Sequence, residues 1–96
     1  MAKFIYKMQS LLNIKEKLED QAKTAFGLAK AALNEEEAKL AELIARKNQY
    51  IEKKRQEMSA SINVHELTQL EHAIKSMEYR IAEQVLVVRQ AEKMSS

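Results

Sequence analysis

The ten residues MSASINVHEL, at positions 58 to 67, decide the fold, because both flanks read as helix for tens of residues. Asn63 is a candidate N-cap, since its side-chain oxygen can accept hydrogen bonds from the free N–H groups of the next turn. Glu66 can reach back to the N–H of Asn63 and complete a capping box, and Ile62 and Leu67 are placed for a hydrophobic staple. This chemistry predicts a helix start in a chain that has no proline and one glycine.

The serines at positions 59 and 61 favour a turn before this start, because their hydroxyls compete for backbone hydrogen bonds. We therefore expect one domain, residues 1–96, with a helix over about 3–58, a turn at about 59–62 and a helix over about 63–94. Two long helices joined by a short turn fold back on each other. The predicted fold class is all-α, an antiparallel two-helix coiled-coil hairpin with helix one longer than helix two.

The second predicted helix has an even heptad pattern, in which apolar steps alternate between three and four residues, as in a coiled-coil seam. Its two lines are Leu67, Ile74, Ile81 and Val88, and Leu70, Met77, Gln84 and Ala91.

The first helix has a less even pattern. One line of residues recurs every seven positions: Phe4, Leu11, Leu18, Ala25 and Ala32. The stripe then slips by about one position, which changes the supercoil locally. Beyond the slip, Leu33 and Leu40 continue one line, and Ile44, Ile51 and Met58 are expected to form the other. Gly27 lies in this slip zone, AFGLAKAAL at residues 25–33, and is expected to be a close-packing site.

The hairpin alignment leaves part of helix one without a partner. Pairing outward from the turn sets Ile74 near Asn48 and Ile81 near Ala41, and the end of helix two near Leu28. The first two dozen or so residues, about 40 Å of helix, then overhang. Their apolar side chains are Phe4, Ile5, Met8, Leu11, Leu12, Ile14 and Leu18. Exposure of such an apolar stripe to water is unfavourable, so we expect another molecule or further chain to cover it.

Composition excludes several functional classes. The chain has no cysteine and one aspartate, Asp20, which a hairpin keeps far from His65 and His72, so no catalytic triad is expected. Those histidines lie seven apart, whereas helical metal pairs lie four apart, so we expect no metal or cofactor and no enzyme activity. A net charge of +2 does not indicate a nucleic-acid partner, and no apolar run is long enough for membrane insertion. The basic stretch 46–55 is either solvated or docks an acidic protein patch.

The opening KFIYKMQSLLNIKEKLEDQAKTAFGLA, residues 3–29, resembles the start of the flagellar export protein FliJ family. The family begins with an aromatic–x–aromatic–x–apolar–Gln element and a leucine pair, which here are Phe4, Tyr6, Met8, Gln9, Leu11 and Leu12. The resemblance continues through EEEAKLAELIARKNQY, residues 35–50, and HELTQLEHAIKSMEYRIAEQ, residues 65–84.

The resemblance implies a non-enzymatic, stalk-like coiled coil of the flagellar type III export apparatus. The partners implied are the export ATPase (FliI-like), whose assembly and activity it promotes, the export gate protein (FlhA-like) and export chaperones. The location implied is cytoplasmic, peripheral to the membrane-bound apparatus.

The resemblance also implies two sets of site residues. The ATPase-binding set at the terminal end is Phe4, Met8, Leu11, Leu12 and Leu18. The export-gate-binding set nearer the turn is Leu43, Tyr50 and Met77, while Lys39, Arg46 and Ala73 depart from the family pattern. Family members have a second helix about as long as the first, so a chain that stops at AEKMSS is expected to be a short or truncated member. ATPase activation is the activity that this would affect most.

Three alternatives remain open at this point. The chain could be the stalk protein of a virulence-type III secretion system, or a generic structural coiled coil that self-associates through the apolar stripe. A membrane-surface helix is a weaker alternative, suggested by Lys3, Lys7, Lys15 and Lys17 beside the apolar residues.

Overall fold

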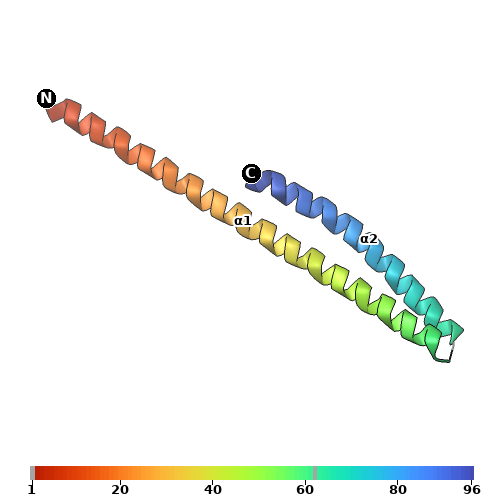
Figure 1. Cartoon of the computed structure of the whole chain (residues 1–96). Coiled ribbons are helices and arrows are strands. Elements are labelled where there is room, and N and C mark those ends of the chain that lie inside the picture. Colours follow the sequence, from red (N-terminus) through yellow and green to blue (C-terminus); the bar gives the residue numbers. More distant parts are fainter. Residues whose placement is uncertain (1, 62) are drawn as a thin grey trace.

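The computed structural model describes residues 2–61 and 63–96 and contains two helices, α1 (Ala2–Ser59) and α2 (Val64–Ser95). The helices run antiparallel, and α1 extends well beyond the free end of α2 (Figure 1). The result is a rod of 91 × 17 × 14 Å. The predicted all-α hairpin with a longer first helix is confirmed.

The turn is made by capping chemistry. The side-chain oxygen of Asn63 accepts hydrogen bonds from the backbone N–H groups of His65, at 3.1 Å, and Glu66, at 3.2 Å. The predicted N-cap is therefore confirmed. At the end of α1, the Ser59 hydroxyl donates to the carbonyl oxygen of Gln56 at 3.0 Å. The predicted staple of Ile62 and the return hydrogen bond to the Asn63 N–H involve residue 62 or its peptide, so both lie outside the described residues.

The seam of α2 is the one that the heptad pattern predicts. Leu70, Met77 and Val88 are buried, with exposed fractions of 8%, 6% and 7%. The remaining predicted seam residues are half-buried: Leu67, Ile74, Ile81, Gln84 and Ala91.

The seam of α1 differs from the prediction in one of its two lines. The buried or half-buried residues are Ala29, Leu33, Glu36, Leu40, Leu43, Lys47, Tyr50, Lys54 and Glu57. The predicted line of Ile44, Ile51 and Met58 was wrong, because these side chains remain 42%, 42% and 58% exposed. The line that faces α2 lies one residue earlier and consists of Leu43, Tyr50 and Glu57. With α1 turned in this way, Lys47 and Lys54 of the neighbouring line reach carboxylates of α2.

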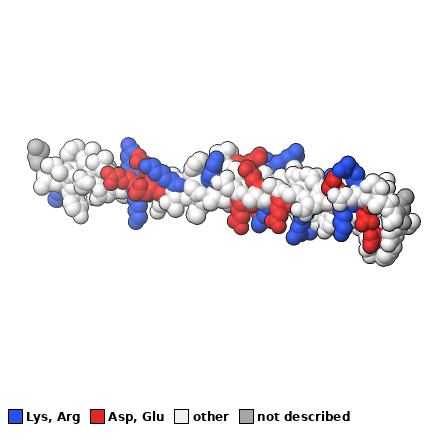
Figure 2. Space-filling model, turned by 60° about the horizontal axis from the view of Figure 1, so that its bottom comes forward, with Lys and Arg blue, Asp and Glu red and all other residues white. Residues whose placement is uncertain are grey.

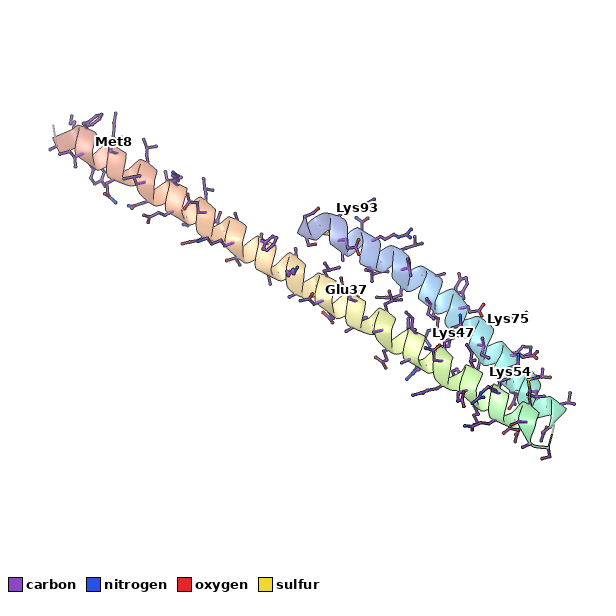
Figure 3. The ribbon with its side chains drawn as sticks, viewed as in Figure 1. Met8, Glu37, Lys47, Lys54, Lys75 and Lys93 are labelled. Carbon is purple, nitrogen blue, oxygen red and sulfur yellow. The ribbon has the colours of Figure 1, made fainter. Side chains whose placement is uncertain are left out.

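Polar contacts across the seam set the alignment of the two helices. Lys47 and Lys54 lie on the side of α1 that faces α2 (Figure 3), and their Nζ atoms lie 3.6 Å from carboxylate oxygens of Glu78 and Glu71 respectively. These lysines bury part of their aliphatic stems while keeping the charge near water.

The third polar contact lies nearer the free end of α2. The amide Nε2 of Gln84 donates to the carbonyl oxygen of Glu36 at 2.9 Å and to its carboxylate at 3.3 Å. All three contacts lie within one helical turn of the predicted alignment.

The slip zone is continuous helix within α1. Gly27 is not the close-packing site that we expected, because a Cβ added there would meet no atom within 4 Å. The zone joins the seven-residue line of Phe4 and Leu11 to the seam of Leu33 and Leu40 without ending the helix.

Candidate protein-binding surfaces

The N-terminal arm, residues 2–28 of α1, is single helix with no neighbour, and every residue in it is exposed. Its length is about 40 Å at 1.5 Å per residue. Met8 lies near its tip, far from α2 (Figure 3). The overhang predicted from the hairpin alignment is therefore present.

The arm carries an apolar face that is wide rather than narrow. All five residues of the predicted ATPase-binding set are exposed, from Met8 at 44% to Phe4 at 68%, and Ile5 and Ile14 are exposed beside them. At about 100° per residue, the face from Ile14 through Leu11 to Ile5 covers about 180° of the helix circumference. A seam between two helices needs a narrower apolar stripe than this. The wide face therefore suits a binding site whose surfaces contact the helix on more than one side.

Charge is sparse at the tip of the arm and denser farther along. Figure 2 shows an almost uncharged N-terminal end, followed by a band of mixed charge. The sequence places the band at residues 15–23, where three lysines alternate with three acidic residues. The apolar tip is thus separated from the hairpin by residues 15–23, whose charged side chains are readily solvated.

A second candidate surface is the groove face, which runs along one flank of the hairpin. It consists of two shallow grooves of about 350 Å³ each. The first is lined by Lys39, Glu42, Leu43, Arg46, Arg80, Glu83, Gln84 and Val87, and the second by Tyr50, Lys53, Glu57, Glu66, Gln69, Leu70 and Ala73.

The predicted gate-binding residues are divided between this face and the seam. Leu43 lines the first groove and Tyr50 lines the second, and both are half-buried. Met77 is 6% exposed and lies in the seam, so it offers little surface of its own. The gate-binding role of these three residues stays a prediction.

The groove face also contains cations that the sequence reading did not assign to a site. Arg46 and Arg80 come from different helices and line the same groove. Neither belongs to an ion pair among the described residues. A usable signal was present, since Lys39, Arg46 and Lys53 recur every seven residues on α1.

Two carboxyl groups beside the seam, those of Glu36 and Glu57, have pKa values shifted in opposite directions. Lys39 and Gln84 both hydrogen-bond the carboxylate of Glu36, which lowers its pKa. Near the turn, a hydrogen bond with Glu66 and the like charge of that residue raise the pKa of Glu57. The Glu57–Glu66 contact is therefore a place where the hairpin brings two acids together.

Within residues 2–61 and 63–96, no three or more His, Cys, Asp and Glu side chains gather as a metal site would require. Neither helix, over the same residues, is long and apolar enough to cross a membrane.

A long antiparallel hairpin that extends into an exposed apolar arm is the architecture of a coiled-coil protein that acts by binding other proteins. The family model described as Flagellar FliJ protein matches residues 4–95. The chain therefore belongs to the FliJ family, and is a coiled-coil protein associated with flagellar export. Searches of curated proteins and of solved structures gave no match.

Proposed function

We propose that this chain is a non-enzymatic stalk of the flagellar export apparatus, which binds the export ATPase ring through its N-terminal arm and the export gate through its groove face. Family membership supports the setting. The observation that carries the proposal is the arm, whose apolar face covers about 180° of a single helix. A ring of subunits surrounds an inserted helix on several sides, as such a face requires.

Binding at the arm would be driven by apolar burial. Each large side chain that a partner covers contributes about 1.5–3 kcal/mol relative to full exposure. Phe4, Leu11 and Leu18 lie one above another along the arm, seven residues apart, and all are at least 60% exposed. The charged side chains of residues 15–23, which flank Leu18, would then lie toward the entrance, where water reaches them.

The groove face supports the second contact of the proposal. Leu43 and Tyr50 supply apolar and aromatic surface, and Arg46 and Arg80 supply positive charge beside it. Arginine and tyrosine are enriched where protein interfaces are energetically important. Carboxylates also line both grooves, so a gate protein that offers charges of both signs around an apolar patch would complement this face.

The test of the arm is ATP hydrolysis by the cognate export ATPase with and without the full chain, together with a direct binding assay. Leu11→Ser with Leu12→Ser should weaken binding at least about tenfold, since two buried leucines are lost. The matched control is Gln9→Ser with Asn13→Ser, which removes a solvent-exposed hydrogen-bonded pair from the arm. Equal binding by both double variants, or no binding by the native chain, would reject the ATPase role.

Self-association is a second candidate, and the same exposed arm favours it. Two arms packed against each other would cover part of the apolar face without any ATPase. A chain that self-associates but neither binds nor stimulates the ATPase would support this structural role instead.

A further inference from the structure

The part of α1 next to the turn carries two overlapping seams. The inward line is Leu43, Tyr50 and Glu57, and the outward line is Ile44, Ile51 and Met58. A third line, Leu40, Lys47 and Lys54, lies between them and can form a seam with either one. With this shared line, either the inward or the outward line gives the alternation of three and four residues that a coiled coil needs.

The seam in the structure is not the more apolar of the two. It places Glu57 half-buried beside Glu66, whereas Met58, the equivalent residue of the outward line, is 58% exposed. Ile44 and Ile51 are likewise each 42% exposed. Hydrophobic burial alone would therefore favour the outward line.

Two ion pairs hold the observed arrangement. Lys47 and Lys54 reach Glu78 and Glu71 at 3.6 Å, on the flank of the seam where the outward line lies. If α1 turned so that Ile44 and Ile51 faced α2, both lysines would move to the opposite flank and leave these carboxylates. Partly exposed ion pairs are individually weak, so a modest competing interaction is enough to break this pair of contacts.

We infer that α1, between Leu40 and the turn, rotates about its axis by about 50° and exchanges the inward line for the outward line. The two ion pairs act as the lock of the observed state. The hydrogen bond from Gln84 to the carbonyl oxygen of Glu36, at 2.9 Å, holds the helix beyond the rotating part. Packed helices with two discrete arrangements are a recognised form of conformational switch.

The rotation would change what the groove face offers. Leu43 and Tyr50 would leave the seam and project from the flank on which Arg80 lies, while Arg46, which turns with α1, would move away from Arg80. A partner that captures them would be helped by burial of the outward line. This consequence rests on the proposed gate contact, whereas the rotation itself does not.

The chain has no cysteine, so single thiols report each line separately. Tyr50→Cys and Ile51→Cys are each placed in the native chain and in an unlocked background, Glu71→Gln with Glu78→Gln. The control background is Glu37→Gln with Glu92→Gln, which removes the same charge from two exposed glutamates that form no ion pair among the described residues. The rate of alkylation by N-ethylmaleimide is measured without any partner protein, so failure of the proposed function would not affect the result.

Rotation predicts changes of opposite sign. In the unlocked background, the thiol at position 50 should react faster, by up to about fivefold, and the thiol at position 51 should react more slowly, since a shift of about 1 kcal/mol changes the ratio of the two states about fivefold. Neither rate should change in the control background. Faster reaction at both positions would indicate simple loosening of the hairpin and overturn the inference. Unchanged rates, or the same changes in the control, would overturn it as well.

Discussion

Asn63 separates two helices that no proline or glycine divides. Its side chain satisfies two backbone N–H groups at the start of α2. Asn63→Ala should therefore lower the free energy of unfolding by about 1 kcal/mol, whereas Asn63→Asp should retain most of it. Urea unfolding followed by circular dichroism measures both variants. An alanine variant as stable as the native chain would show that the cap does not stabilise the turn.

Glu57 gives the turn a dependence on pH. The contact with Glu66 raises the pKa of Glu57, so the folded chain binds a proton more readily there than the unfolded chain does. Its contribution to stability is present at low pH and is lost as the pH rises through the raised pKa. Glu57→Gln should thus raise the melting temperature at pH 7 and have little effect below the ordinary value of 4.5.

The control for this prediction is Glu36→Gln. The pKa of Glu36 is lowered by its hydrogen bonds with Lys39 and Gln84, so its ionised form stabilises the fold. That stabilisation is present above the ordinary pKa of 4.5 and is lost as the pH falls through the lowered pKa. Glu36→Gln should therefore lower the melting temperature at pH 7. Shifts of the same sign in both variants would contradict the assigned causes.

At the scale of the element, α1 extends beyond the part that packs against α2. Gly27 lies where the arm joins the hairpin. Glycine costs about 1 kcal/mol against alanine inside a helix, and nothing surrounds the position of its missing Cβ. On heating, the Gly27→Ala variant of the isolated chain should retain more helix than the native chain does, as followed by circular dichroism. Ala31→Gly, at an exposed position nearby, should have the opposite effect. A loss of helicity in Gly27→Ala would show that the glycine serves a contact absent from the single chain.

At the scale of the whole molecule, the hairpin and the arm are separable. The seam contacts lie between residues 29 and 95, whereas the arm contributes no buried residue. Leu11→Ser with Leu12→Ser should therefore reduce concentration-dependent association of the chain, as measured by analytical ultracentrifugation, while the thermal unfolding of the hairpin is retained. Unfolding of the whole chain in this variant would mean that the arm belongs to the core.

The sequence by itself determined the turn, the seam of α2, the overhanging arm and the family resemblance. Each of these rests on local chemistry or on a period that one helix carries alone. The cap follows from Asn63, and the seam of α2 follows from its single apolar stripe, because no competing stripe lies beside it.

Only the tertiary structure decided which line of α1 faces α2. Periodicity could not choose between Ile51 and Tyr50, because each completes a regular seam with the shared line of Leu40, Lys47 and Lys54. The choice depends on Glu71 and Glu78, which lie across the hairpin and pair with those lysines at 3.6 Å. The groove face depends on the same choice, since Arg46 and Arg80 meet only when the two helices are aligned in this way.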